Sequence, residues 1–329
     1  MWRKTFKSTF LKNYVNGTLV IALGGNAIKR ADQLGTAEDQ FRNLEITCDQ
    51  LVGVVERGYR LVITHGNGPQ VGNLSLQQEL AKGSVPPQPL DILGAMTQGQ
   101  IGYMIQQSLG NALRRRGLSV PVVTVLTQVI VDPNDPAFED PTKPIGPFYD
   151  EEDAKRASKE RGFFIKEIKE LGDKRFRRVV PSPDPKEVVE RDAIRKLLEL
   201  GFIVISVGGG GIPVIAKDGR LKGVEAVIDK DPASEILAES IDADVLMLLT
   251  DVDAARLNYG KANEVKLGRV SVAEMEAYYK EGHFPPGSMG PKVLAGIRFV
   301  KRTGNEAMIT SLDKAIDALE GKAGTLIFR

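Results

Sequence analysis

Short runs of apolar residues alternate with longer amphipathic segments along most of the chain. The runs have the length of buried strands, and the segments between them have the spacing of helices that bury one face. Strands that alternate with helices predict a mainly parallel sheet covered by helices on both faces, an α/β fold. The expected strands span residues 18–23, 60–64, 122–131, 202–207, 245–249, 307–310 and 325–328.

The expected helices carry start and stop signals. Thr36 is a suitable N-cap for a helix that reaches Gly58. Pro69 suits the first turn of the next helix, where its missing N–H costs nothing. Further helices are expected from Asp91 to the arginines at 114–116, over 186–200 and after Asp231, with a hairpin around 217–220.

One segment breaks this alternation. The stretch VDPNDPAFEDPTKPIGPFYD at 131–150 is rich in proline, which excludes a core helix or a central strand. The chain stays charged and irregular to about Pro185. We expect residues 132–182 to form a small lobe that protrudes from the main sheet.

Composition narrows the class of protein. The length of 329 residues suits about two domains, or one large α/β domain with an appendage. A content of 42% hydrophobic and 26% charged residues suits a soluble globular chain. A net charge of +1 gives no global field for nucleic acid or an acidic membrane. Cys48 is alone and falls on the apolar face of a helix, so a buried thiol is expected. No apolar run reaches the length of a membrane span, and a cytoplasmic location is expected.

Residues 1–16 differ from the rest, because they are basic, lack acids and place aromatic residues at helical spacing. A targeting leader has this character, but the apolar core of a secretory signal is missing. A natural or vector-derived extension is the favoured interpretation, and the fold prediction leaves this segment out.

Three of the expected strands end in glycine-rich turns. Such turns can present backbone N–H groups to a ligand without a Cβ in the way, and a following helix adds partial positive charge. One turn alone is explained by tight-turn geometry. Three turns at one sheet edge predict a groove for phosphate or carboxylate. The residues expected to bind are Gly24, Gly25, Asn26, Gly66, Asn67, Gly68, Gly209 and Gly210.

Lysines near this edge are candidates for phosphoryl transfer, which needs cations around the transferring group. Lys230 lies between Asp229 and Asp231 before a helix, although, taken alone, a solvated turn with Asp231 as N-cap is the favoured interpretation. Lys292 begins another helix, where a cation is unfavourable unless an anion is bound. Lys143 is stiffened by neighbouring prolines. Thr250 and Asp251 could hold a ribose or simply end a strand.

The two histidines do not indicate a metal site, because they are far apart in the sequence. His65 lies at a strand end beside Gly66, and we expect it to orient or pack rather than to act as an acid or base. His283 is expected to be a loop or packing residue.

Two phosphate-binding motifs were compared with the chain. The Walker pattern does not occur, whereas GNGPQVG at 66–72 is close to a dinucleotide fingerprint with Asp91 as its downstream acid. A dinucleotide-dependent oxidoreductase therefore remains an alternative. It leaves the other two glycine turns and the three lysines unexplained.

Longer motifs, from IALGGNAI at 21–28 through PTKPIGPF at 141–148 to HFPPGSMGPK at 283–292, together resemble the carbamate kinases of the amino acid kinase family. GGN and GGGG are shared across the wider family, whereas PTKPIGPF and GVEAVIDKD are particular to the carbamate kinases. The likeness covers nearly all of the chain after residue 17. The matching stretches are IALGGNAI, THGNGPQVGN, AMTQGQIGY, DPAFEDPTKPIGPF, RRVVPSP, GGGGIPV, KGVEAVIDKD and HFPPGSMGPK.

The resemblance implies an open αβα sandwich with a mainly parallel eight-stranded sheet. Residues 17–220 would form the lobe that binds carbamate or carbamoyl phosphate, with a lid subdomain over 132–182. Residues 221–329 would form the nucleotide-binding lobe. A homodimer in the cytoplasm is expected.

The implied reaction is carbamoyl phosphate + ADP ⇌ carbamate + ATP with Mg²⁺, running toward ATP in arginine catabolism. Lys230 and Lys292 would clamp the transferring group, Asp231 would orient them, and Lys143 would come from the lid. No metal ligand is expected from the chain, because phosphates would hold the Mg²⁺. The residues that would bound the nucleotide are Thr250, Asp251, Val252, Tyr259, Met289 and Lys292.

Other functions remain open beside the resemblance. A related kinase could act on a larger acid such as glutamate or acetylglutamate, although PTKPIGPF argues against it. A nucleotide sensor without activity is disfavoured by the intact set of lysines. An assay for ATP formation separates these possibilities.

Overall fold

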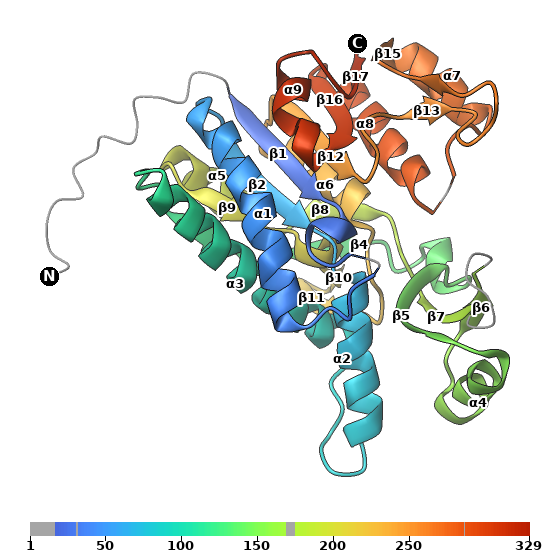
Figure 1. The fold of residues 1–329 in the computed structure, drawn as a ribbon. Helices are drawn as coiled ribbons and strands as arrows, with labels where there is room; N and C mark the ends of the chain where they lie inside the picture. Colours follow the sequence, from blue (N-terminus) through green and yellow to red (C-terminus); the bar gives the residue numbers. More distant parts are fainter. Residues whose placement is uncertain (1–16, 31, 169–174, 286) are drawn as a thin grey trace, which may run out of the picture.

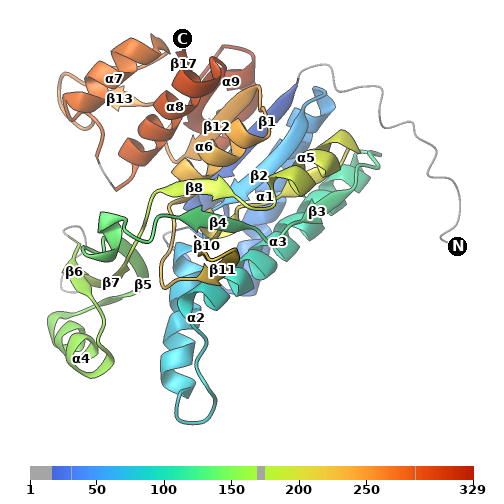
Figure 2. The ribbon, with the colours of Figure 1, turned by 180° about the vertical axis from the view of Figure 1, so that it is seen from behind.

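A computed structural model describes residues 17–30, 32–168, 175–285 and 287–329. The expectation for the segment 1–16 lies outside these residues. A central sheet crosses the molecule and is covered by helices on both sides (Figures 1 and 2). Its eight strands run in the order β15-β17-β16-β12-β1-β2-β9-β3. Only β16 and β17 pair antiparallel, so the predicted mainly parallel eight-stranded sheet is confirmed.

The sheet's strands are short, and its inner strands are mostly buried whereas the edge strands β3 and β15 are partly exposed. Their bounds are β1 Thr18–Leu23, β2 Arg60–His65, β3 Val122–Thr124, β9 Ile203–Ile205, β12 Val245–Thr250, β15 Arg269–Ser271, β16 Glu306–Ser311 and β17 Thr325–Phe328.

Alternate residues of the central strand β1 face the two helical layers. Leu19 and Ile21 belong to the core under α1 (Ala37–Glu56) and α3 (Leu90–Arg115), the helices in front of the sheet in Figure 1. Val20 and Ala22 belong to the core under α6 (Lys230–Ser240) and α8 (Met289–Thr303). A strand buried on both faces has no polar alternation, which explains its continuous apolar sequence.

The remaining helices include α5, which packs against β9, and α4, which packs against the strands of the protruding lobe. Their bounds are α2 Gly68–Ala81, α4 Glu151–Arg161, α5 Arg191–Glu199, α7 Val272–Lys280 and α9 Ala315–Leu319, with 3₁₀ turns η2 Gly25–Ala27, η3 Pro136–Phe138, η4 Gly208–Gly210 and η5 Leu312–Lys314. Thr36 caps α1 through a capping box with Asp39, as the sequence predicts.

Three smaller sheets complete the fold. One joins β4 (Gln128–Val131), β8 (Pro185–Val188), β10 (Ile212–Lys217) and β11 (Arg220–Gly223). A two-stranded ribbon pairs β13 (Arg256–Leu257) with β14 (Val265–Lys266). The third, in the protruding lobe, joins β5 (Lys143–Tyr149), β6 (Ile165–Glu167) and β7 (Phe176–Val180).

Three details differ from the sequence prediction. The run 122–131 is two strands in different sheets, because β3 pairs with β9 whereas β4 pairs with β8 and β10. The helix expected from residue 186 begins at Arg191, because residues 185–188 pair with β4. The proline-rich segment is less irregular than expected, since β5 forms there as an edge strand, where missing N–H groups are tolerated.

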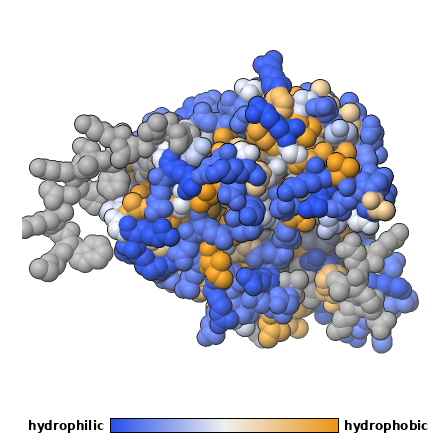
Figure 3. Space-filling model, turned by 45° about the horizontal axis from the view of Figure 1, so that its top comes forward, coloured by the Kyte–Doolittle hydropathy of each residue, from blue (hydrophilic) through white to orange (hydrophobic). Residues whose placement is uncertain are grey.

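The protruding lobe, here called the lid subdomain and described over residues 132–168 and 175–182, stands away from the main sheet beside α2 (Figure 1). It carries β5, α4, β6 and β7 around one strand layer. On the face shown in Figure 3, hydrophilic residues predominate and hydrophobic ones are scattered among them.

Candidate active site

The three glycine-rich turns follow β1, β2 and β9, which are near neighbours at the centre of the sheet. Parallel strands end at the same edge, so the turns meet there. With the first turns of α6 and α8 they enclose a cavity of about 170 Å³. The cavity is lined by Gly25, Gly66, Asn67, Gly68, Lys143, Gly209, Val227, Ile228, Asp229, Lys230, Asp231, Gly287, Ser288, Pro291 and Lys292.

The turn at 208–211 is held by buried polar contacts. Gln98 on α3 donates from Nε2 to the carbonyl of Gly208 and to that of Thr127, both at 3.0 Å, and its Oε1 accepts from the Thr127 N–H. Gly209 has φ +65°, and a Cβ there would come within 2.2 Å of the Asn67 side-chain nitrogen. The motif AMTQGQIGY contains Gln98, but its bridging contacts could not be foreseen from the sequence.

A buried carboxylate joins two of the predicted lysines. Asp231 accepts from the Lys230 ammonium at 2.8 Å through one oxygen and from Lys292 at 3.1 Å through the other. Lys292 also donates to the Ser288 carbonyl at 3.3 Å. Asp231 is 2% exposed, so its charge is stabilised by these ammonium groups rather than by water.

Asp229 joins the third lysine to the same cavity. Its carboxylate forms an ion pair with Lys143 of the lid subdomain and caps α6 by accepting from the Asp231 N–H. Three lysines and two aspartates leave one uncompensated positive charge in this group. Sequence reasoning treated Asp229 only as a flanking acid, because its distance along the chain from Lys143 hides the pairing.

Burial and neighbouring charges set the protonation of these groups. Burial alone would lower the pKa of Lys230, but Asp231 and Asp229 outweigh it and the pKa is raised. Burial and repulsion from Lys230 lower the pKa of Lys292, with Asp231 opposing them. Burial would raise the pKa of Asp229, but Lys143 and Lys230 hold it well below its usual range. The cavity thus keeps ionised groups of both signs.

His65 lies beneath the glycine turns rather than among the residues that line the cavity. Its side chain is buried, and Nδ1 donates to the Gly66 carbonyl at 3.0 Å. Burial lowers the pKa of His65 to about 4, so the ring is neutral near pH 7. His283 contacts Glu281 and packs edge-on against Tyr278 in a loop.

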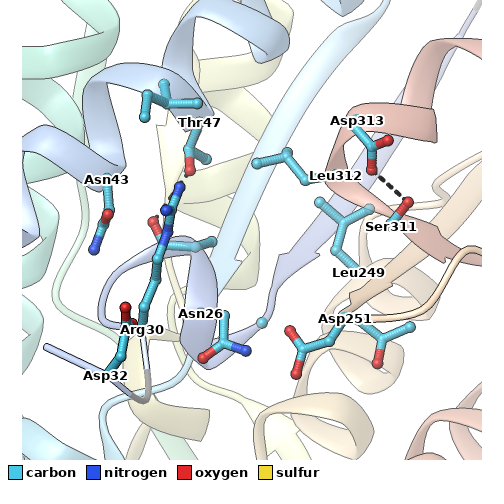
Figure 4. Close-up of a pocket in the computed structure, with 14 residues that line it drawn as sticks. Asn26, Arg30, Asp32, Asn43, Thr47, Leu249, Asp251, Ser311, Leu312 and Asp313 are labelled. Carbon is cyan, nitrogen blue, oxygen red and sulfur yellow. Dashed lines mark hydrogen bonds between the residues drawn. The ribbon is translucent and has the colours of Figure 1, made fainter.

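A second cavity of about 500 Å³ lies at the ends of β1, β12 and β16 (Figure 4). It shares the Gly24–Asn26 turn with the first, because Gly24 and Asn26 line the second cavity and Gly25 lines the first. Asn26 and Asp251 point toward its lower part in this view. Thr250 and Asp251 line it too.

Some of the predicted residues line neither cavity. In the parts of the chain that the structure describes, these are Gly210, Val252, Tyr259 and Met289. Gly210 instead lies against Ile228, where a Cβ would come within 2.3 Å of the backbone carbonyl oxygen. Tyr259 is 61% exposed.

Neither a metal-binding cluster nor a membrane-spanning helix occurs among the described residues. Their His, Cys, Asp and Glu side chains form no group of three or more that could hold a metal ion. No helix among these residues is both long and apolar enough to span a membrane.

The fold and this cavity define the class of protein, an αβα sandwich with a lysine-lined cavity at the ends of its parallel strands. The model of the amino acid kinase family matches residues 17–311. The chain belongs to the amino acid kinase family, which confirms the resemblance seen in the sequence.

Curated relatives and solved structures narrow the comparison. The chain is 58% identical to the carbamate kinase of Thermococcus kodakarensis over 314 residues, which covers 94% of this chain and 99% of that protein. It is 56% identical to that of Pyrococcus horikoshii over 311 residues, covering 94% and 98%. Carbamate kinase from Giardia lamblia bound to AMP-PNP superposes with a TM-score of 0.89 at 45% identity, covering 96% of this chain and 99% of that one.

The burial of His65 predicts a pH dependence of stability. Above pH 6.5 the ring is neutral in both the folded and the unfolded chain. As the pH falls from 6.5 to about 4, the unfolded chain binds a proton that the folded chain excludes, and the free energy of unfolding drops by up to roughly 3 kcal/mol. Denaturant unfolding of wild type and His65→Asn across this range should show a shallower decline in the variant. Parallel curves would contradict the assignment.

The bridging role of Asp231 predicts that Asp231→Asn destabilises the protein. The change leaves two buried ammonium groups without their shared carboxylate, which costs about 3 kcal/mol, the scale for breaking a buried ion pair. Inorganic phosphate should restore part of this loss, because an anion replaces the missing charge. Urea unfolding with and without phosphate measures both effects. Asp49→Asn, in an exposed pair with Arg115, is the control, and an equal loss there would disprove the bridge.

Proposed function

We propose that the protein is a carbamate kinase that catalyses carbamoyl phosphate + ADP ⇌ carbamate + ATP, in the cytoplasm, as a homodimer, and in the direction of ATP during catabolism. The observation that carries this proposal is the cavity in which Lys143, Lys230 and Lys292 meet backbone from three glycine turns. Relatives named as carbamate kinases at high identity support it. The kinase activity itself follows from the family.

The lysines act by electrostatic stabilisation. In phosphoryl transfer, charge spreads over the oxygens of the transferring group, and pre-positioned cations lower the barrier without reorganising. Asp231 fixes both Lys230 and Lys292 through ion pairs. Their ammonium groups would contact the phosphoryl oxygens from the α6 and α8 side.

No general base is required in this reaction. The attacking oxygen, of carbamate in one direction and of the ADP phosphate in the other, is already anionic. This agrees with a cavity lined by no histidine among the described residues, and with the neutral, buried ring of His65. Positioning therefore supplies most of the catalysis.

The acceptor side lies between the turn at 66–68, the turn at 208–210 and the lid subdomain. Gly66 and Gly68 would let N–H groups approach the anion, with amide donation from Asn67. The lid subdomain would close this side and deliver Lys143. A cavity of about 170 Å³ has room for a small acid such as carbamate.

The nucleotide would occupy the region after β12, bounded by Thr250, Asp251, Val252, Tyr259 and Met289, with Lys292 toward its phosphates. Asp229 and Asp231 already pair with lysines, and the described residues form no metal-binding cluster. Mg²⁺ would therefore enter with the nucleotide, held by its phosphates, and neutralise their charge.

The dinucleotide alternative finds no support in the geometry. Asp91, its proposed ribose acid, lies against Gly223 of β11, where a Cβ would come within 1.7 Å of its carboxylate. It is absent from the residues that line the glycine-turn cavity.

The direct test is an assay of the purified protein with ADP, carbamoyl phosphate and Mg²⁺, in which ATP formed is coupled to a luminescent readout. We expect ATP to form above a reaction that lacks the metal. Lys230→Met and Lys292→Met should each lower kcat by ~10²–10³, the scale for losing one preorganised donor. Folded protein that forms no ATP would disprove the proposed function.

The lid assignment is tested by Lys143→Ala. Lys143 reaches the cavity from β5 and contacts Asp229, so its loss should lower kcat by ~10² or more while the Kd of ADP stays within about twofold. Calorimetry gives the Kd and the coupled assay gives kcat. A large loss of ADP affinity with normal turnover would place Lys143 on the nucleotide instead.

A further inference from the structure

The lid subdomain rests on one face of α2. Ile145 of β5 is fully buried in a small apolar cluster that includes Val71 of α2. Arg178 of β7 donates to the Ser75 hydroxyl on α2 and stacks over Phe163, 3.9 Å from the ring centre. Apolar packing and one charged hydrogen bond therefore hold the lid subdomain against this helix.

Between these contacts, two glycines bring backbone against backbone. A Cβ on Gly72 of α2 would lie 1.9 Å from the backbone nitrogen of Gly146 and 2.0 Å from its Cα. Ordinary contacts are 3.4 Å or longer, so any side chain at Gly72 would force the two segments about 1.5 Å apart. Gly146 has φ +72°, a backbone conformation that is strained for residues with a Cβ and therefore favours glycine.

This contact is linked to the cavity through both of its partners. Lys143 is three residues before Gly146 on β5 and carries the ammonium that pairs with Asp229. On the other side, Gly68 begins α2 and lies about one helical turn before Gly72. One short helix thus supports an anion-binding turn at its start and the lid subdomain one turn later.

We propose that Gly72 is a positioning residue for phosphoryl transfer: its missing side chain lets the lid subdomain seat against α2 at the depth that brings Lys143 over the cavity. The inference rests on the proposed function. It assigns the last glycine of THGNGPQVG to the lid subdomain rather than to the anion.

The test compares Gly72→Ala with Gly99→Ala. Both glycines lie within helices, but a Cβ on Gly99 meets nothing within 4 Å, so only the first variant disturbs the lid subdomain. A displacement of about 1 Å at a positioning group costs roughly 10²-fold in rate. We expect Gly72→Ala to lose about 10²-fold in kcat, with the Kd of ADP unchanged within twofold, and Gly99→Ala to retain wild-type kcat.

The position of the lid subdomain can be measured without activity. Spin labels on Gln77→Cys of α2 and Lys159→Cys of α4 report the distance between helix and lid subdomain. Cys48 will not be labelled, because it is fully buried and burial raises the pKa of its thiol well above the usual value. Gly72→Ala should lengthen or broaden this distance, and Gly99→Ala should not.

Two results would overturn the proposal: wild-type kcat in Gly72→Ala, or a lower kcat with an unchanged label distance. If Gly72→Ala does not fold, Ser75→Ala replaces it, because this change removes the Arg178 contact without adding volume. Ser75→Ala should lower kcat by about tenfold, the scale for a charged hydrogen bond, and broaden the label distance. An unchanged kcat or an unchanged label distance in this variant would also overturn the proposal. If the wild-type protein forms no ATP, the proposed function is refuted. The contact between the lid subdomain and α2 is still tested in that case, because the label distance is measured without activity.

Discussion

The arrangement of the site depends on the carboxylate of Asp231, which bridges two ammonium groups in a place that water hardly reaches. Without it, Lys230 and Lys292 would repel each other across a buried gap. The same residue lies in the first turn of α6, whose start is tied to β2 through Ser234 and Thr64 at 2.6 Å. The lysines are thus held by the core of the fold rather than by flexible loops, and this suits a reaction in which positioned charge lowers the barrier.

The glycine turns and the lysines supply complementary parts of one surface. The turns allow close backbone approach, and the ammonium groups supply full charges that a backbone cannot. The turns are held in place because they end buried parallel strands, and Gln98 of α3 hydrogen-bonds to the turn at 208–211. Lys143 differs, because it belongs to the lid subdomain and reaches the cavity only through the contacts of β5 with α2. Lys230 and Lys292 are therefore held by helices of the central sandwich, whereas Lys143 is held by the lid subdomain.

The sequence predicted the central sheet well because its strands are continuous apolar runs, and a run such as Thr18–Leu23 has few alternatives. It also predicted the shared edge, since parallel strands fix where their turns meet. The sequence did not predict pairings between distant segments, such as Asp229 with Lys143 or Gln98 with Gly208. The split of 122–131 into two sheets was missed for a similar reason, because local periodicity does not identify a strand's partners. The roles assigned to individual site residues remain predictions.

The central place of β1 has a consequence for how the chain is made. Its neighbours are β2, which follows soon after in the sequence, and β12, which begins at Val245. During synthesis at 5–20 residues per second, one edge of β1 waits for roughly ten seconds to most of a minute before its second partner leaves the ribosome. An apolar strand with an unpaired edge is a site for wrong association. The nascent N-terminal half therefore keeps one edge of β1 unpaired until the strand from the C-terminal half has been made.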